Sequence, residues 1–400
     1  MKKNILCVSL PAKLCYNEKR RPKGTDWTDA GLPPDGGGLW QCSGKKLSRK
    51  ERKIMKIVVL GGGISTERDV SLSSSRMIYE ALKKKGHQVV LLDVYLGYEG
   101  SSGDVENIFE KDCNWAENIG GIRESNPDLS AIKAMRKDGG RSYFGPNVLN
   151  ICSRADVVFL GLHGEDGENG KVQAAFDLLG IRYTGTDYVS SALSMDKSLS
   201  KELFAYHHIP TPAGVHIRKK DAGQQKSPVA LPCVVKACRG GSSVGVSIAH
   251  SEEEYRKALE EAFLYDDEAV VEQYIEGREF SCAVIDGKAL PVIEIAPLHG
   301  FYDYKNKYQA GSTVETCPAD LPEEKAKEIQ EISEKVFEVL RLKNYARMDF
   351  MMGKDGSVYC LEANTLPGMT PTSLIPQEAQ AIGVGFEDLC EWILKLAFRG

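Results

Sequence analysis

The sequence contains no apolar run that approaches the roughly 20 residues needed to span a membrane as a helix, so we expect no membrane partner. It has no internal repeat, and its 11 cysteines form neither C-x-x-C pairs nor Cys/His clusters at the spacing of a zinc site. The first apolar run is short for an export signal and ends at Pro11. These absences favour a cytoplasmic protein with reduced thiols.

Acidic residues outnumber basic ones over most of the sequence, and the formal net charge of the whole chain is −5. Residues 1–54 hold 13 Lys or Arg and 5 Asp or Glu, a net of +8 (13 − 5), which leaves −13 (−5 − 8) for the remainder. That remainder argues against nucleic acid as the main partner. Residues 1–54 lack any helical or strand period. We interpret them as a disordered extension, or as the product of a start codon placed too far upstream, rather than as a basic interaction arm.

The chain does contain enough apolar residues for two or three packed domains, since 42% of its 400 residues are hydrophobic and 27% are charged. From Met55, the pattern KIVVL, a glycine turn, a helical period ending at Gly86 and the pattern QVVLLDV predict a βαβ unit of a parallel sheet. A further buried strand ends at His163. Residues 97–150, rich in Gly, Asn and charge, predict a loop-heavy insertion.

The glycine turn GGGIST follows the first predicted strand, as in dinucleotide-binding proteins. Gly61 and Gly63 fit the G-x-G-x-x-G pattern, but Thr66 stands where the third glycine belongs. An NAD-dependent dehydrogenase therefore stays open as an alternative of another class. A plain tight turn explains this motif equally well.

A second glycine segment, GGSSVGV, lies between two predicted strands. Gly240 and Gly245 have the spacing of a P-loop, but Val246 replaces its lysine and the residues that follow predict a strand rather than a helix. A hairpin with exposed amides can still hold a phosphate, with Lys236 on the preceding strand as a point charge. The alternative is a Gly/Ser loop without a function.

Polar side chains crowd into the otherwise apolar stretch ARMDFMMGKDGSVYCLEANTLPGMT. Its GKDG segment predicts a hairpin turn. If Met352 pairs with Ser357, Asp349 lies opposite Cys360 and Arg347 opposite Glu362. Because side chains alternate along a strand, we expect one face to carry the four polar groups and the other to carry core residues. The polar set is Arg347, Asp349, Glu362 and Asn364, and the predicted core set is Met348, Phe350, Tyr359, Leu361 and Ala363.

The oxygen ligands in this set are the type that Mg²⁺ prefers. A half-exposed hairpin with a polar outer face is the alternative if the stretch is taken alone. Two lysines near a possible nucleotide (Lys197 and Lys236), the glycine hairpin and the Asp/Glu/Asn face together point to phosphate chemistry.

At this point the sequence resembles the D-alanine–D-alanine ligases of the ATP-grasp superfamily. The motifs that carry the resemblance run in family order from Met55 to the end of the chain: GGGISTERDVSLSSS, LHGEDGENG, YTGTDYVSSALSMDKSLSK, VVKACRGGSSVGVS, FYDYKNKY and ARMDF…LEANTLPGMTPTS. The loop around residues 165–169 and the insertion at 97–150 depart from the pattern that we expect for the family.

The resemblance implies an α/β fold with α+β character in its C-terminal part. After the extension at 1–54, it implies a Rossmann-like domain at 55–196, a small ATP-grasp lid domain at 197–278 and a large ATP-grasp domain at 279–400. It implies a bacterial cytoplasmic enzyme, a homodimer, that uses ATP and two Mg²⁺ ions, with Mn²⁺ able to substitute. ATP phosphorylates the carboxylate of one D-alanine, and the amine of a second attacks the acyl phosphate to form a dipeptide for peptidoglycan synthesis.

The resemblance also implies a role for particular residues. Glu67, Ser242, Tyr308 and Arg347 are the expected catalytic set, in which Glu67 holds the ammonium of the first D-alanine and Arg347 stabilises the oxyanion. Expected to bind the amino-acid substrates are His163, Gly368, Ser373 and Leu374. Expected to contact ATP are Lys197, Lys236, Ser243, Glu272, Glu279 and Lys307, and expected to bind the metal ions are Asp349, Glu362 and Asn364.

Tyr308 bears on the second substrate, because a phenol held by Glu67 and Ser242 resembles the dipeptide-forming members. D-Alanine is therefore expected ahead of D-serine, and D-lactate after both. A non-catalytic ATP-binding module remains a further alternative.

Overall fold

The structure is a computed structural model, and it describes residues 53–117, 119–121, 127–223, 226–241, 245–298 and 312–399. The expected extension at 1–54 thus lies outside the described residues, except for its last two positions. Within the described ranges, no helix is both long enough and apolar enough to cross a membrane.

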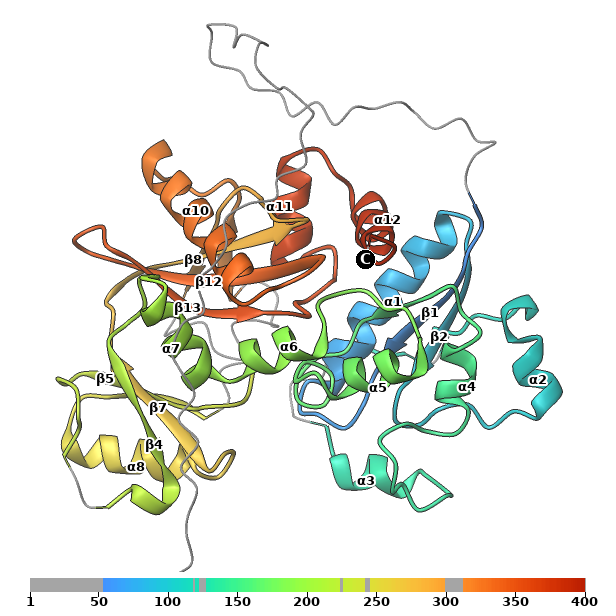
Figure 1. Cartoon of the computed structure of the whole chain (residues 1–400), viewed down its shortest axis with the longest axis horizontal. Helices are drawn as coiled ribbons and strands as arrows, with labels where there is room; N and C mark the ends of the chain where they lie inside the picture. The colour runs from blue at the N-terminus through green and yellow to red at the C-terminus, as the bar shows by residue number, and fades with distance from the viewer. Residues whose placement is uncertain are drawn as a thin grey trace, which may run out of the picture. The chain divides into compact units, whose positions relative to one another are not determined.

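The N-terminal part of the described chain is the predicted βαβ unit (Figure 1). Strands β1 (Lys56–Gly61), β2 (Gln88–Asp93) and β3 (Val157–Leu160) form a parallel sheet in the order β2-β1-β3, and helix α1 (Arg68–Lys84) joins the first two. The apolar strands are buried almost throughout, as in parallel sheets covered on both faces. The prediction for this region is confirmed.

The segment at 97–150 is less irregular than the sequence suggested. Its described residues contain four short helical pieces: α2 (Ser102–Glu106), η1 (Ile108–Glu110), α3 (Leu129–Ala134) and α4 (Val148–Cys152). Each piece supplies apolar residues, such as Val105, Ile108 and Ile151, to the core under the parallel sheet. Pieces this short show no readable helical period, so only their packing reveals them.

Three helices lead from the parallel sheet into the rest of the chain: α5 (Lys171–Leu179), α6 (Tyr188–Met195) and α7 (Lys197–Tyr206). Asp196 separates the last two. Its carboxylate accepts a hydrogen bond from the backbone N–H of Leu199 at 3.0 Å and so caps α7. This cap fixes where Lys197, the first residue of α7, enters the structure.

The next part is a four-stranded antiparallel sheet in the order β4-β7-β5-β6. Strands β5 and β6 flank the glycine segment, so the predicted hairpin is confirmed. Helix α8 packs on this sheet through Tyr255, Leu259 and Phe263. The elements are β4 (Gly214–Arg218), η2 (Lys219–Asp221), β5 (Cys233–Ala237), β6 (Val246–Ala249), α8 (Glu252–Ala262) and β7 (Glu268–Gln273).

A larger sheet follows in the order β11-β10-β8-β12-β13, with β9 paired to β8. Helix α10 covers one face of it with Ile329, Val336 and Phe337. The strands are β8 (Gly277–Ile285), β9 (Lys288–Ala289), β10 (Ile293–Pro297), β11 (Thr313–Thr316), β12 (Tyr345–Gly353) and β13 (Val358–Asn364), and the helices are α10 (Glu323–Val339), α11 (Leu374–Ala381) and α12 (Phe386–Leu396).

The C-terminal helices complete the core of the N-terminal sheet. Helix α12 lies beside α1 (Figure 1), and one apolar cluster contains Ile57 and Ile78 together with Leu389 and Ile393. The beginning and the end of the described chain therefore fold together, and Met369 in the loop after β13 donates its backbone N–H to the hydroxyl of Ser74 on α1.

Candidate active site

A cavity of about 450 Å³ lies between the four-stranded sheet and the larger sheet. Charged side chains from both sheets line it beside apolar ones, the usual composition of a ligand site. The lining includes Lys197, Lys236, Glu272, Glu279, Asp349 and Glu362, with Val234, Ile248, Ile275, Met351 and Leu361 among the apolar residues.

The β12–β13 hairpin supplies the polar wall of the cavity, and its register differs from the predicted one. Met352 pairs with Val358 rather than Ser357, and Phe350 rather than Asp349 pairs with Cys360. Between Phe350 and Asp349 the register shifts once more at a β-bulge, which leaves Leu361 as the extra residue of β13. The two shifts of one residue each add up to a shift of two residues, so the side chains beyond the bulge lie on the predicted faces.

Beyond the bulge, Asp349 pairs with Glu362 and Arg347 pairs with Asn364. These four residues, the hairpin cluster, therefore share one face as predicted. The prediction was wrong nearer the turn. Cys360 is fully buried in the core, whereas Tyr359 is only half-buried and Leu361 lines the cavity.

The hairpin cluster is tightly hydrogen-bonded. The Arg347 guanidinium donates to both carboxylate oxygens of Asp349, with Nε–Oδ1 and Nη2–Oδ2 distances of 2.8 Å each. The Asn364 amide donates to Oδ2 of Asp349 at 2.9 Å, and the hydroxyl of Ser281 on β8 donates to Oδ1 at 2.9 Å. Asp349 is thus fixed from three strands.

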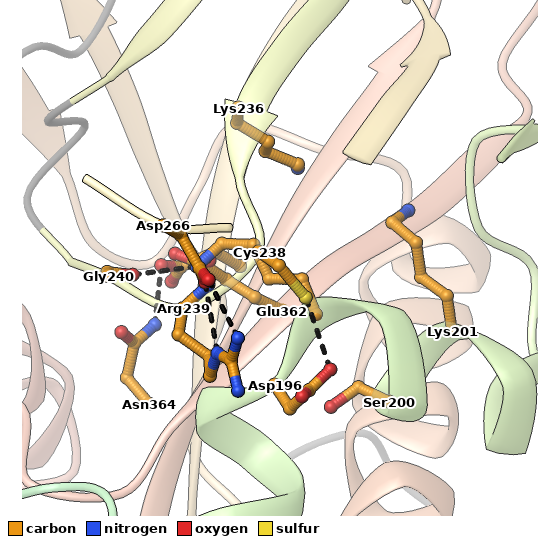
Figure 2. Close-up of polar contacts among 12 residues, drawn as sticks. Asp196, Ser200, Lys201, Lys236, Cys238, Arg239, Gly240, Asp266, Glu362 and Asn364 are labelled. Atoms are coloured by element: carbon orange, nitrogen blue, oxygen red, sulfur yellow. Dashed lines mark hydrogen bonds and ion pairs between the residues drawn. The ribbon is translucent and has the colours of Figure 1, made fainter. Parts of the chain in front are cut away.

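Lys197 connects the hairpin to the glycine segment. Its ammonium lies 3.2 Å from a carboxylate oxygen of Glu362 and donates to the carbonyl of Gly240 at 2.7 Å. Its backbone N–H donates to the carbonyl of Cys238 at 3.1 Å. Figure 2 shows two further contacts at the start of the glycine segment. The Cys238 thiol donates to the carboxylate of Asp196, and the Arg239 guanidinium donates two hydrogen bonds to the carboxylate of Asp266.

Glu272 on β7 lies between two lysines. Lys236 on β5 is 2.5 Å from one carboxylate oxygen and Lys201 on α7 is 2.6 Å from the other, and we refer to these three residues as the Glu272 cluster. Burial raises the pKa of Glu272, but the two ammonium groups reverse this and hold it below its ordinary value. Burial likewise opposes the charge of Lys236, yet the carboxylates of Glu272 and Glu362 keep its pKa raised.

Glu67 reaches the same region from the start of α1. A Cβ at Gly164 would lie 3.0 Å from Oε2 of Glu67, and a Cβ at Gly241 would lie 2.9 Å from it. The buried carboxylate therefore occupies the space between these two glycines, one of them at the start of the glycine loop. Any side chain at Gly241 would push against Glu67.

Glu168 is a carboxyl group next to Glu67 that we did not predict. It is half-buried, and its desolvation together with the Glu67 charge raises its pKa well above the ordinary value. The backbone N–H of Gly164 donates to it at 2.6 Å. Its signal in the sequence was the carboxylate-rich loop GEDGENG directly after His163.

His163 lies three residues after the end of β3, which stops at Leu160 rather than at His163 as predicted, and it is connected to the loop after β13. Its Nε2 is 3.1 Å from the hydroxyl of Ser74, and that hydroxyl accepts from the backbone N–H of Met369 at 3.4 Å. Burial lowers the pKa of His163 to about 4, so the imidazole is neutral at pH 7. The serine that joins the two segments could not be found from the sequence.

The remaining predicted substrate residues lie on the loop and helix after β13. The Ser373 hydroxyl accepts from the backbone N–H of Thr370 at 3.0 Å, and a Cβ at Gly368 would lie 2.9 Å from that hydroxyl. The Leu374 side chain is buried against Ile293 and Ile295, so only its backbone can face a substrate. Glu279 on β8 lines the cavity beside the hairpin.

Four predicted site residues lie outside the described residues: Ser242, Ser243, Lys307 and Tyr308. Their assignments stay predictions.

The space beside the N-terminal glycine turn is filled by side chains of the protein itself. A Cβ at Gly62 would lie 2.4 Å from a carboxylate oxygen of Asp93, the acidic residue that ends β2. Asp93 is paired with Arg68, and it accepts from the backbone N–H groups of Tyr95 and Leu96. These contacts favour the tight-turn interpretation over a dinucleotide site.

A parallel sheet followed by two antiparallel sheets, with lysines and carboxylates lining a cavity between the latter, defines the ATP-grasp class of fold. The chain belongs to the D-alanine–D-alanine ligase family. The family model for the "D-ala D-ala ligase N-terminus" matches residues 56–186, and that for the "D-ala D-ala ligase C-terminus" matches residues 203–395. This membership leaves the dehydrogenase alternative without support.

Named relatives agree with the family models. The chain is 46% identical over 336 residues to a D-alanine–D-alanine ligase of Lacticaseibacillus casei, covering 84% of this chain and 93% of the relative. It is 45% identical over 342 residues to that of Pediococcus pentosaceus, covering 85% of this chain and 97% of the relative.

Solved structures show the same similarity. The D-alanine–D-alanine ligase from Bacillus anthracis complexed with ATP matches with a TM-score of 0.63 and 31% identity, covering 87% of this chain and 98% of that one. The VanG D-Ala:D-Ser ligase from Enterococcus faecalis matches with a TM-score of 0.67 and 28% identity, covering 86% of this chain and 100% of that one.

Proposed function

We propose that this protein joins two D-alanine molecules at the expense of ATP, forming ADP, phosphate and the dipeptide through a D-alanyl phosphate. The observation that carries the proposal is the hairpin cluster, whose carboxylates Asp349 and Glu362 line a cavity together with Lys197 and Lys236. Family membership and the ATP complex of a structural relative support the same reaction. Transfer of a phosphoryl group to a carboxylate requires charge neutralisation and placement more than it requires a protein nucleophile.

The cations of the cavity are placed to neutralise this charge. In this structure Lys197 and Lys236 each contact a carboxylate, Glu362 and Glu272 respectively. When phosphates enter, these ammonium groups can turn from carboxylate to phosphate oxygens without crossing the cavity. Arg347 holds its planar fork against Asp349, a residue of the cavity wall. A fork suits two oxygens of an acyl phosphate or the developing oxyanion better than a lysine does.

Mg²⁺ fits the donor set of the hairpin cluster. Asp349 and Glu362 lie at the cavity wall, and Asn364 shares their face of the hairpin. Hard oxygen donors of this kind suit Mg²⁺. When bound, the ions neutralise phosphate charge. The orientation of Asp349 is set by the protein through Arg347, Asn364 and Ser281.

The first D-alanine is proposed to lie near Glu67 and His163. Glu67 offers negative charge for its ammonium, and the neutral imidazole of His163 adds no competing positive charge at pH 7. The raised pKa of the neighbouring Glu168 favours the protonated form of that carboxyl, which limits the negative charge gathered beside Glu67. Ser242 and Tyr308 are proposed to close over this site. Together with Glu279, Ser243 and Lys307 are proposed to contact ATP. The second substrate is proposed to be held by Gly368, Ser373 and the backbone of Leu374.

Family membership supports the rest of the proposal. The chain is a cytoplasmic homodimer that acts in peptidoglycan synthesis, with domains at 55–196, 197–278 and 279–400, and it uses two Mg²⁺ ions.

The test is phosphate release from ATP and Mg²⁺ with D-alanine, L-alanine, D-serine or D-lactate, in the wild-type protein, Glu362→Gln and the exposed control Glu331→Gln. Release with D-alanine, retained in the control and lost in Glu362→Gln, supports the ligase and the metal face. Absence of release with any D-amino acid refutes the reaction.

One comparison favours keeping D-serine as a second candidate, since a structural relative is described as a D-Ala:D-Ser ligase. Mass spectrometry of the product formed from equal D-alanine and D-serine separates the two possibilities. A mixed dipeptide as the main product would reassign the second substrate and leave the first half-reaction unchanged.

A further inference from the structure

Lys201 is a buried lysine close to the cavity that the proposed reaction does not use. It lies one helical turn after Lys197 on α7, and its side chain is only 12% exposed. Its ammonium is 2.6 Å from Oε2 of Glu272 and donates to the hydroxyl of Thr211 at 2.8 Å. Figure 2 shows Lys201 and Lys236 coming from a helix and a strand, respectively.

Lys201 approaches Glu272 from outside the cavity. Glu272 and Lys236 belong to the cavity lining, whereas Lys201 does not. One oxygen of Glu272 therefore faces a cation at the ligand site and the other faces a cation behind it. A ligand can displace the first contact but leaves the second in place.

Glu272 depends on these cations for its charge. It is 2% exposed, and burial alone would favour its protonated form. Among the described residues, the ionisable groups that face it are Lys236 from β5 and Lys201 from α7. Burial lowers the pKa of Lys201, whereas the Glu272 carboxylate favours its charged form. The Cys360 thiol of β13 lies nearby, and burial raises its pKa. From β4 only Gly214 lies opposite, and it carries no side chain. When Lys236 turns toward a phosphate, Lys201 is the remaining contact cation.

We propose that Lys201 is a positioning residue that keeps Glu272 ionised while nucleotide is bound, so that Glu272 can accept a hydrogen bond from the amino group of the base. The inference rests on the proposed function together with the expectation that Glu272 contacts ATP, which we extend to the amino group of adenine. A carboxylate accepts from an amino group, whereas a protonated carboxyl offers a donor on one oxygen. Lys201 thereby helps select a base that carries an amino group at that edge.

The experiment measures the Kd of MgADP by calorimetry from pH 6 to pH 9 in the wild-type protein, Lys201→Met, Lys201→Arg and the exposed control Lys220→Met. Without its rear cation, Glu272 is expected to bind a proton as the pH falls. Lys201→Met should therefore bind MgADP about tenfold more weakly than the wild-type protein at pH 6, and the difference should shrink toward pH 9. Lys201→Arg should follow the wild-type profile, as should Lys220→Met.

A purely structural role for Lys201 would weaken binding equally at every pH, and that result would overturn the proposal, as would an unchanged Kd. Circular dichroism checks that each variant is folded. If Lys201→Met fails to fold, the conservative Lys201→Arg tests the role of the charge. A Kd that loses its wild-type pH profile in Lys201→Arg also counts against the proposal. Failure of the proposed function is distinguishable, because the wild-type protein would then bind no MgADP or release no phosphate with D-alanine.

Discussion

Two groups of charged residues each contribute carboxylates to the same cavity, and they neutralise these carboxylates in different ways. In the hairpin cluster, Asp349 is bound by Arg347, which stands two residues earlier on the same strand. In the Glu272 cluster, the carboxylate is bound by lysines from another strand and from a helix. The first arrangement follows from local geometry, whereas the second exists only while α7 and the four-stranded sheet stay together.

This difference suggests a division of labour. A cluster built on one hairpin can hold its geometry regardless of how the four-stranded sheet moves, which suits groups that stabilise a transition state. A cluster assembled from several elements senses their relative positions, which suits groups that bind and release nucleotide. Four predictions test the comparison.

The largest expected effect is on the hairpin cluster. Arg347→Lys should lower kcat for D-alanine-dependent phosphate release by about 100- to 1,000-fold, because one ammonium cannot replace a fork that contacts two oxygens. The KM for ATP should change little. Steady-state kinetics check this, with the exposed Arg256→Lys as control. A kcat within tenfold of the wild-type value would show that the fork is not needed.

Glu378 is a third buried carboxyl group, and it differs from Asp349 and Glu272 because it has no ion pair among the described residues. It accepts a hydrogen bond from the backbone N–H of Ala283 at 2.7 Å. Burial raises its pKa to about 8. Between pH 4.5 and about 8, the unfolded chain releases a proton that the folded chain keeps, so stability falls as the pH rises through this window.

The Glu378→Gln variant cannot titrate and should lose this part of the pH dependence. From pH 5 to pH 8, the wild-type protein should lose on the order of 3 kcal/mol more unfolding free energy than the variant does. Urea denaturation at several pH values measures the difference, and Glu331→Gln on the exposed face of α10 is the control. Parallel profiles for wild-type and variant would mean that Glu378 is ionised in the folded state.

For the Glu272 cluster, the expected effect is on binding. Glu272→Gln removes the charge that balances two buried ammonium groups and weakens the contact to the base, so the KM for ATP should rise about 10- to 100-fold. The value of kcat should change much less. Kinetics at saturating D-alanine test this against the exposed Glu260→Gln. A loss confined to kcat would place Glu272 with the hairpin cluster instead.

The smallest effect concerns the support of the hairpin cluster by a neighbouring strand. Ser281→Ala removes the hydrogen bond to Asp349, which is worth about 1 kcal/mol and so about fivefold in apparent Mg²⁺ affinity. A Mg²⁺ titration of phosphate release measures it, and the exposed Ser153→Ala should leave the titration unchanged. If both variants behave alike, the hairpin holds Asp349 without help from β8.

The comparison also shows which parts of the molecule the sequence could predict. Strands β1 and β2 and helix α1 were predicted because their apolar residues recur with a clear period. The shared face of Arg347, Asp349, Glu362 and Asn364 was predicted although the pairing was wrong. The shift at the turn and the bulge at Leu361 together move the pairing by two residues, and a shift of two leaves each side chain on the same face.

Contacts between distant segments left no such signal. Lys201 and Glu272, Ser281 and Asp349, and Ser74 with His163 meet only through the fold, and none of these partners has a distinctive spacing in the sequence. Tyr359 and Leu361 were placed in the core because strict alternation was assumed, and a bulge breaks alternation. Glu168 had a local signal, but its burial next to Glu67 depends on tertiary structure.

The bulge in β13 also has a consequence for protein engineering. Because Leu361 is the unpaired residue, its deletion would join Cys360 directly to Glu362 and keep every existing partner along the β12–β13 ladder. The side chain lost from the chain would be one that lines the cavity. A one-codon deletion therefore offers a way to widen this cavity for bulkier ligands while Arg347, Asp349, Glu362 and Asn364 keep their shared face.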